Sequence, residues 1–447
     1  MTTYHCGTAW LPPGRVARDV EVVVDGDRIV SVTEGAQPAA DVARLGGLVL
    51  PGLANAHSHA FHRALRGRTH GGHGTFWTWR EQMYAVAGRL DPDGYLALAR
   101  ATFAEMALAG VTCVGEFHYL HHTATGRPYD DPNTMGHVLV QAARDAGLRI
   151  ALLDACYLTG GLGRPLEGVQ LRFGDGDAER WADRASELHT SYGQDDDVVV
   201  GAALHSARAV PRDQMAAVAA WSHHHGAPLH AHVSEQRAEN EACAEAYGVT
   251  PTRLLHEHGV LGPRTSAVHA THVTDEDIAL LGGSQTFACI CPTTERDLAD
   301  GIGPARRLHE AGSAITLGSD SHAVVDLLEE ARAVELHERL ATETRGHWTA
   351  GELLGAATGN GHASLGFPAA GSITAGALAD LVAVRLDSVR TAGAGPDAAA
   401  TVIFAATAAD VTDVVSSGRR VVAEGRHVLV PDVAGSLTAG VGAVVPT

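Results

Sequence analysis

The alternation of apolar and polar residues predicts a different kind of structure at the chain ends than in the middle. Near the N-terminus, two β-branched runs at 20–24 and 28–32 flank the turn Asp25-Gly26-Asp27. An Asp-Gly turn between two such runs predicts a β-hairpin. The segment from Ser372 onward repeats the pattern, with runs at 380–384, 411–415 and 420–422. We therefore predict one small β-sandwich domain built from both chain ends, residues 1–48 and 372–447.

The middle of the chain follows another rhythm, in which a helical stretch leads into a short apolar run that ends in polar residues. Eight runs are predicted as strands, at 48–54, 111–116, 149–155, 198–204, 228–232, 267–270, 286–291 and 314–317. Helices are predicted between them at 94–109, 134–146, 178–192, 212–225, 250–258 and 326–341. Repeated βα units form a parallel sheet, so residues 49–371 are predicted to be a TIM-type (β/α)8 barrel of the α/β class. The active site of such a barrel lies at the C-terminal ends of its strands.

Composition narrows the classes of partner. The chain has 447 residues, of which 45% are hydrophobic and 19% charged, and this predicts a globular protein with a sizeable core. A formal net charge of −19 argues against nucleic acid or an anionic membrane as the main partner. The sequence has no apolar run near the roughly 18 residues of a membrane span.

Cysteine and lysine usage exclude further classes. The six cysteines are scattered without a CxxC pair, so neither a disulfide framework nor a thiolate zinc site is indicated, and a cytoplasmic location is expected. All 33 basic side chains counted as Lys+Arg are arginines. Without lysine, the protein cannot use Schiff-base chemistry or a metal site bridged by a modified lysine.

Polar residues at the strand ends carry the candidate chemistry. His57 and His59 follow the first apolar run of the barrel, and side chains two residues apart on a strand point to the same side. Two imidazoles on one side can supply the first two ligands of a catalytic zinc ion. In a chain with 27 histidines the pair alone is a weak signal, since two surface or core imidazoles would look the same.

The remaining ligands come from later strands. Asp320 follows the eighth run, and the fifth offers His230 and His232 on one face. We choose His232 because it lies nearer the strand's C-terminal end, although periodicity alone does not exclude His230. Asp320 could instead cap the helix at 326–341, a role that Ser321 or Asp326 could fill equally well.

These residues belong to longer motifs through which the chain resembles the amidohydrolase superfamily and, within it, the formimidoylglutamate deiminases. The HxH pair and the aspartate after strand eight are shared by the superfamily, whereas the WxWR stretch 77–80 and the EFHY stretch 116–119 are specific. The motifs lie at 55–63, 76–81, 116–122, 205–210, 232–235, 268–272, 291–295 and 318–322.

The resemblance implies an activity and a set of site residues. Formimidoylglutamate deiminases are zinc enzymes of histidine degradation that convert N-formimino-L-glutamate and water to N-formyl-L-glutamate and ammonia. The resemblance implies one Zn²⁺ per chain. Its implied ligands are His57, His59, His232 and Asp320, and the implied catalytic residues are Glu235, His269 and Asp320. For the substrate it implies Arg80, Tyr119, His205 and Arg208, together with His62 where the family usually has glutamine.

Physical chemistry is consistent with this reading and leaves two alternatives. Arginine binds a carboxylate through two parallel hydrogen bonds, which suits the small-molecule substrate N-formimino-L-glutamate with its two carboxylates. One alternative is another mononuclear aminohydrolase acting on a purine, pyrimidine or triazine, which needs a flat, amide-rich pocket. The other is a non-catalytic barrel scaffold, which predicts gaps in the ligand set, and the sequence has none. A homodimer is the expected assembly, although no residue pattern addresses the oligomeric state.

Overall fold

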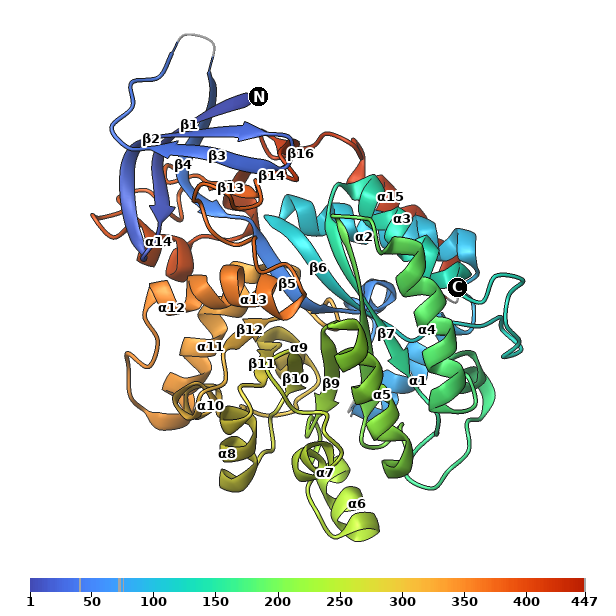
Figure 1. Ribbon diagram of the computed structural model, residues 1–447. Coiled ribbons are helices and arrows are strands. Elements are labelled where there is room, and N and C mark those ends of the chain that lie inside the picture. Colours follow the sequence, from blue (N-terminus) through green and yellow to red (C-terminus); the bar gives the residue numbers. More distant parts are fainter. Residues whose placement is uncertain (40–41, 71–73, 75, 446–447) are drawn as a thin grey trace.

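The computed structural model describes residues 1–39, 42–70, 74 and 76–445, and its described part is organised by two eight-stranded sheets (Figure 1). One sheet is parallel and its strands follow each other in chain order. Its strands are β5 (Leu53–Ser58), β6 (Val111–His118), β7 (Arg149–Cys156), β8 (Val198–Ser206), β9 (Leu229–Val233), β10 (Thr265–His269), β11 (Phe287–Ile290) and β12 (Ile315–Leu317).

The first and last strands of this sheet meet and close it into a barrel. Ser58 and Asp320 form a parallel bridge, the amide of Asp320 donates to the carbonyl of His57 at 3.0 Å, and the amide of His59 donates to the carbonyl of Asp320 at 3.3 Å. The predicted (β/α)8 barrel is therefore confirmed. The closure also brings together the two chain segments that carry His57, His59 and Asp320.

Helices surround the barrel and connect its strands (Figure 1). The predicted helices at 134–146, 178–192 and 212–225 agree with the observed bounds. The helices are α1 (Phe76–Ala87), α2 (Pro92–Leu108), α3 (Thr134–Ala146), α4 (Ala178–Tyr192), α5 (Arg212–His225), α6 (Arg237–Tyr247), α7 (Pro251–Glu257), α8 (Asp275–Gly283), α9 (Pro292–Asp297), α10 (Ala305–Ala311), α11 (Leu327–Thr342), α12 (Ala350–Gly355), α13 (Gly361–Ser364), α14 (Ala398–Ala405) and α15 (Val433–Val444). Shorter turns are η1 (Ala60–Leu65), η2 (Gly168–Arg172), η3 (Ala356–Asn360) and η4 (Ala408–Asp410).

The second sheet is separate from the barrel and is built from both chain ends, as predicted. Strand β4 joins the two parts, because it pairs in parallel with β1 and antiparallel with β13. The strand order is β16-β15-β14-β13-β4-β1-β2-β3. The bounds are β1 (Thr2–Leu11), β2 (Arg15–Asp25), β3 (Arg28–Thr33), β4 (Ala43–Pro51), β13 (Leu381–Val384), β14 (Val411–Ser416), β15 (Arg419–Ala423) and β16 (Arg426–His427).

The apolar run predicted as the first barrel strand, 48–54, is divided between the two sheets. Its first part completes β4, and the barrel strand β5 begins only at Leu53. The break lies at Gly52, where a Cβ atom would come within 2.1 Å of Thr112 Oγ1 and 2.8 Å of Asp380 Cβ. Since the chain stays buried on both sides of the break, the hydrophobic pattern gives no sign of it.

The C-terminal helix α15 was not predicted and packs against α2 on the outside of the barrel (Figure 1). Gly440 permits this approach, because a Cβ atom there would lie 3.1 Å from Leu98 Cα. Throughout the described ranges, no helix is both long and apolar enough to span a bilayer.

Candidate metal centre and active site

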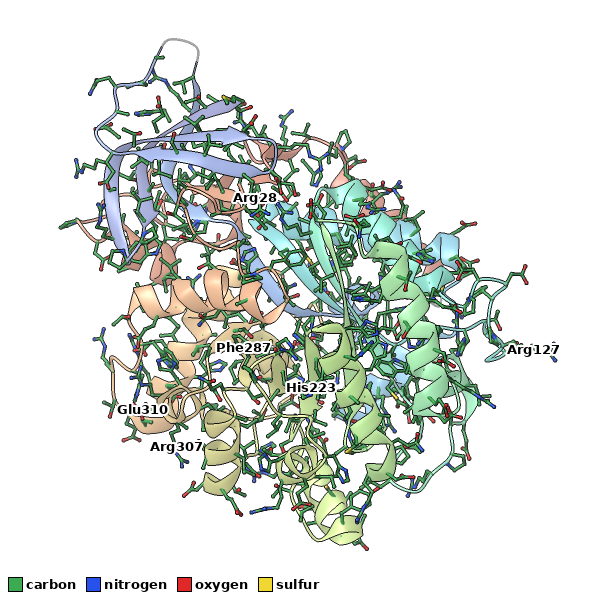
Figure 2. All side chains as sticks on the ribbon, in the orientation of Figure 1. Arg28, Arg127, His223, Phe287, Arg307 and Glu310 are labelled. Atoms are coloured by element: carbon green, nitrogen blue, oxygen red, sulfur yellow. The ribbon has the colours of Figure 1, made fainter. Side chains whose placement is uncertain are left out.

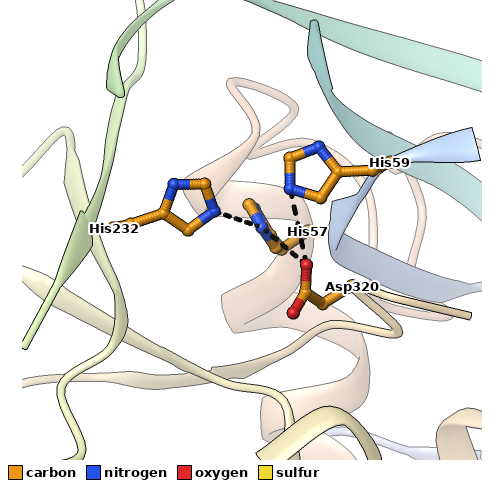
Figure 3. A group of neighbouring side chains, drawn as sticks. All are labelled: His57, His59, His232 and Asp320. Atoms are coloured by element: carbon orange, nitrogen blue, oxygen red, sulfur yellow. Dashed lines mark hydrogen bonds and ion pairs between the residues drawn. The ribbon is translucent and has the colours of Figure 1, made fainter. Parts of the chain in front are cut away.

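Three histidines and one aspartate converge at the C-terminal end of the barrel (Figure 3). His57 lies on β5, His59 follows that strand, His232 lies on β9, and Asp320 follows β12. Asp320 Oδ1 lies 3.4 Å from Nε2 of His57 and 3.4 Å from Nε2 of His59. The Nε2 atoms of His57 and His232 are 3.1 Å apart.

These distances fit a tetrahedral divalent metal. Bonds of 2.0–2.1 Å to nitrogen and oxygen place neighbouring ligand atoms of a tetrahedron about 3.3 Å apart. Two histidines also present unprotonated Nε2 atoms to the centre, since His59 Nδ1 donates to the carbonyl of Phe117 at 3.0 Å and His232 Nδ1 donates to that of His205 at 2.9 Å. Facing lone pairs this close repel each other unless a cation or proton lies between them. The donor set is therefore that of a metal site.

A layer of hydrogen bonds behind the ligands holds them in place. The residues that form these hydrogen bonds had no predicted role. Asn55 Nδ2 donates to Ser319 Oγ at 2.7 Å, and the amide of Ser319 donates back to Asn55 Oδ1 at 2.9 Å. Glu116 accepts hydrogen bonds from Ser58 Oγ at 2.6 Å and from the amide of Ala60 at 2.7 Å. Burial raises the pKa of Glu116 to about 8. These residues lie within the sequence motifs, but only their hydrogen-bond partners across the barrel reveal their role.

The backbone around the site contains residues other than glycine in the left-handed region. Ser234 has φ of 52°, His269 of 70°, Ala270 of 49°, Asp320 of 35° and His322 of 58°. Such conformations are unfavourable for side chains with a Cβ atom and persist only where surrounding contacts enforce them. The strand ends thus accept local strain where they turn side chains toward the centre.

Glu235 and His269 lie beside the ligand group. His269 Nε2 is 3.8 Å from Glu235 Oε1 and 3.8 Å from Asp320 Oδ2, while its Nδ1 is 3.5 Å from Glu295 Oε1. Burial raises the pKa of Glu235 to about 7 despite the opposing charge of His269. Burial alone would lower the pKa of His269, but Glu235 and Glu295 raise it well above its ordinary value. The two residues form a buried acid–base pair beside the ligand group.

A cavity of about 550 Å³ opens above these groups. It is lined by every residue proposed from the sequence except His57, which is fully buried. The predicted residues in its wall are His59, His62, Arg80, Tyr119, His205, Arg208, His232, Glu235, His269 and Asp320. The glycine-rich stretch 160–162 also lines the cavity, as do aromatic side chains from α1.

Three arginines, Arg80, Arg164 and Arg208, bring positive charge to the wall of this cavity. The guanidinium carbon of Arg80 lies 4.5 Å from the ring centre of Trp77 and 5.5 Å from that of Tyr84. Within the described part of the chain, Arg80 forms no ion pair with a carboxylate. Arg208 Nε lies 3.9 Å from Glu239 Oε1, and among the described residues neither Nε nor the Glu239 carboxylate has a hydrogen-bond partner.

The other predicted substrate residues form one aromatic wall. His62 Nε2 is hydrogen-bonded to the hydroxyl of Tyr119 at 2.9 Å, and the ring centres of Tyr119 and His205 are 5.6 Å apart. His62 also packs against His59, with ring centres 4.5 Å apart. Burial holds the pKa of both His62 and His205 well below the ordinary value, so each is a neutral imidazole.

The structure addresses the two choices left open by the sequence. His230 Nε2 donates to the carbonyl of Ser364 at 3.2 Å and is outside the four-residue group, which contains His232. The helix after the eighth strand, α11, is capped by Asp326, whose Oδ1 accepts from the amides of Leu328 and Glu329. Asp320 is therefore free of the capping role and points to the centre.

A second group of buried ionisable residues, His118, His121 and Asp154, resembles a metal site by spacing alone. Both oxygens of Asp154 are already occupied: Oδ1 accepts from Trp181 Nε1 at 2.9 Å and from Arg184 at 2.8 Å, and Oδ2 accepts from Arg184 at 2.8 Å. This group is a structural ion-pair network.

The same network extends to Asp175, which accepts from Arg184 at 2.9 Å and lies 3.2 Å from His122 Nε2. Burial alone would raise the pKa of Asp175, but His122 and Arg184 hold it far below its ordinary value. The carboxylate is therefore charged in the folded protein throughout the neutral range.

Comparison with known proteins agrees with this geometry. The sequence model of the Amidohydrolase family matches residues 48–421. Formimidoylglutamate deiminase of Pseudomonas aeruginosa is 35% identical over 439 residues, covering 96% of each chain, and 8-oxoguanine deaminase of the same organism is 30% identical over 409 residues, covering 87% of each. The crystal structure of an amidohydrolase from Brucella melitensis has a TM-score of 0.93 at 32% identity, with 100% of both chains covered. The predicted resemblance and the predicted enzyme class, a hydrolase acting on C–N bonds, are confirmed, and the chain belongs to the amidohydrolase family.

Proposed function

We propose that this protein is a zinc-dependent formimidoylglutamate deiminase, which hydrolyses N-formimino-L-glutamate to N-formyl-L-glutamate and ammonia. The observation that carries the proposal is the placement of Arg80 and Arg208 in the wall of the same cavity that ends at the His/Asp group. A substrate with two carboxylates and one amidine carbon matches a cavity whose wall carries guanidinium groups, those of Arg80 and Arg208 among them, and one hydrolytic centre. The relative at 35% identity, itself a formimidoylglutamate deiminase, supports this choice.

The residues of the centre suit hydrolysis of an amidine. His57, His59, His232 and Asp320 would hold the metal, which when bound lowers the pKa of a coordinated water to about 7 and so supplies the nucleophile. Asp320 would accept a proton from the attacking water. Glu235 would deliver a proton to the departing nitrogen, so that it leaves as ammonia.

His269 and the aromatic wall would position the reacting carbon. Because neighbouring carboxylates raise the pKa of His269, its Nε2 would donate a hydrogen bond to the attacked centre. We assign Arg208, with the neutral imidazole of His205 and the hydroxyl of Tyr119, to the glutamate portion of the substrate. Arg80 would hold its second carboxylate, and His62 would act through its hydrogen bond to Tyr119.

Zinc is the metal we propose, since imidazole nitrogen and carboxylate oxygen at tetrahedral spacing are its usual ligands. The predicted homodimer and the predicted cytoplasmic location stay predictions.

Deamination of a ring is the second candidate, favoured by the relative that is an 8-oxoguanine deaminase. A purine would need a hydrogen-bonding partner for its edge and a flat stacking surface. The aromatic wall supplies stacking, but the cations in the cavity favour an anionic ligand over a neutral base. The present cavity therefore fits a dicarboxylate better.

A substrate panel on the purified holoenzyme tests the proposal. Ammonia release is measured with N-formimino-L-glutamate, 8-oxoguanine, guanine and cytosine at equal concentration, and zinc per chain is measured on the same sample. We expect N-formimino-L-glutamate to exceed each base by at least about 10³-fold in kcat/KM, because a base lacks both carboxylates. Preferred turnover of a base, or no turnover of N-formimino-L-glutamate by zinc-replete protein, would overturn it.

A further inference from the structure

Arg172, at the end of η2, is a buried arginine outside the active site. Its side chain donates three hydrogen bonds, each to a backbone carbonyl: Nε to His122 at 2.9 Å, one terminal nitrogen to Ala87, and the other to Leu90 at 2.7 Å. The residue is only 1% exposed. A buried guanidinium with this many fixed acceptors joins the segments to which those acceptors belong.

The positive charge of Arg172 is stabilised by neutral partners rather than by a carboxylate. Over the described ranges, no carboxylate lies within ion-pair distance of it, so its partners are backbone carbonyl dipoles and the side chain of Tyr129. Burial accordingly lowers the pKa of Arg172 below its ordinary value. One of those carbonyls, that of Ala87, belongs to the last turn of α1, where carbonyls lack partners within the helix and favour a cation. Arg172 thus caps the C-terminal end of α1.

Further contacts tie η2 to the same two regions. The backbone carbonyl of Arg172 accepts hydrogen bonds from the amides of His121 at 3.0 Å and His122 at 2.9 Å, two and three residues after the loop residue Tyr119. Gln170, two residues earlier, donates from Nε2 to the hydroxyl of Tyr84 on α1 at 2.9 Å. The short segment 170–172 therefore holds the end of α1 against the loop that follows β6.

Both regions face the proposed glutamate side of the cavity. Helix α1 contributes Arg80 and Tyr84 to the cavity wall, and the guanidinium of Arg80 stacks near the Tyr84 ring. Phe173, next to Arg172, also lines the cavity, with its ring centre 5.1 Å from that of Tyr119. A shift of η2 would therefore move Arg80 and Tyr119 relative to each other.

We propose that Arg172 and Gln170 are positioning residues that fix α1 and the Tyr119 loop, and through them the recognition of the substrate's glutamate portion. This role rests on the proposed function, because it concerns where the carboxylates of N-formimino-L-glutamate bind. Loss of the hydrogen bonds from Arg172 and Gln170 should weaken substrate binding and leave the hydrolytic centre intact.

The test compares Arg172→Lys with Arg149→Lys in the full-length holoenzyme. Arg149 is an equally buried arginine, but it pairs with Asp197 and Asp380, and Asp380 precedes β13 of the second sheet. Lysine keeps the charge and cannot reach three carbonyls at once. We expect Arg172→Lys to raise KM for N-formimino-L-glutamate at least about tenfold with kcat within about threefold of wild type and zinc per chain unchanged. Arg149→Lys should leave KM unchanged.

Hydrogen exchange measured by mass spectrometry separates this inference from the proposed function. Arg172→Lys should speed exchange in residues 76–90 with respect to both the wild type and Arg149→Lys, whichever substrate the enzyme uses. If the wild type does not act on N-formimino-L-glutamate, the proposed function fails, and the exchange measurement still tests whether Arg172 positions α1. If Arg172→Lys does not fold, Gln170→Ala decides it by the same two readouts. Unchanged KM together with unchanged exchange in 76–90 would overturn the inference, as would an equal rise of KM in Arg149→Lys.

Discussion

Replacing Arg208 by alanine is the sharpest test of the proposed substrate. The guanidinium of Arg208 lines the cavity, and its side chain is only 17% exposed. Its Nε atom has no hydrogen-bond partner among the described residues, and its nearest described carboxylate, on Glu239, lies at 3.9 Å. Arg208 thus has no hydrogen bond from Nε that a ligand would have to replace.

The size of the effect follows from this environment. Removing one member of a buried, hydrogen-bonded charge pair costs about 2–5 kcal/mol. At about 1.4 kcal/mol for each factor of ten, kcat/KM should fall by about 30- to 4,000-fold. Glu239 shifts the expectation away from the lower limit, because without Arg208 its carboxylate would face that of the substrate. The loss should be mainly in KM, since the contact exists in both the bound substrate and the transition state.

The assay measures ammonia release from N-formimino-L-glutamate together with zinc per chain. Arg127→Ala is the matched control, because Arg127 is an exposed arginine at the periphery of the molecule (Figure 2). A substrate analogue that lacks the side-chain carboxylate completes a double-mutant cycle with Arg208 and a second one with Arg80. Arg208 does not bind the substrate if Arg208→Ala retains zinc and its kcat/KM stays within about threefold of that of Arg127→Ala.

The remaining predictions concern the metal, the proton donor and stability. His232→Ala should lose zinc on dialysis and with it all activity, whereas His230→Ala should retain about one zinc per chain. The zinc content of both variants is measured by mass spectrometry of the metal, and equal content would contradict the proposed ligand set. Glu235→Gln should lower kcat by about 10²- to 10⁴-fold with zinc retained, which single-turnover kinetics can show. A fall in kcat of less than tenfold would exclude Glu235 as the proton donor. Asp175→Asn should lower the free energy of unfolding by about 3–5 kcal/mol at pH 7 by leaving Arg184 without its full set of partners. Because the pKa of Asp175 is depressed by folding, its contribution is complete above the unfolded pKa of about 3.9 and is lost below it, so urea titrations of the two proteins should converge as the pH falls below about 4.

The regular elements of the barrel could be predicted because their pattern is local. Strands β6, β7 and β8 are mostly apolar and buried along nearly their whole length, and α3 has the regular apolar spacing of a helix that buries one face. The first barrel strand was misplaced because Gly52 interrupts a run that is buried on both sides. A break caused by the close approach of Thr112 and Asp380 depends on residues far away in the sequence, and no local pattern contains it.

The metal ligands could be proposed from the sequence for a related reason. Strand ends of a closed parallel barrel meet at one point, so polar residues after successive strands are near neighbours once the fold is known. The hydrogen bonds that orient them are less accessible, because a buried carboxylate such as Glu116 could serve any of several partners. Only the three-dimensional contacts show that it holds Ser58 and Ala60 next to the ligand pair.

The least predictable parts are those that we propose determine the substrate. Helix α1 carries Arg80 and α6 carries Glu239, and neither helix was predicted from the sequence. Helix α1 has an apolar face formed by Phe76, Trp79, Met83, Val86 and Ala87, so its spacing could have predicted it. Only two residues of α6, Glu239 and Cys243, are buried, so α6 lacks the apolar face by which a core helix is recognised. A helix that lines an open cavity presents polar groups where a core helix would be apolar, so the missing periodic signal of α6 is a consequence of its place in the cavity wall.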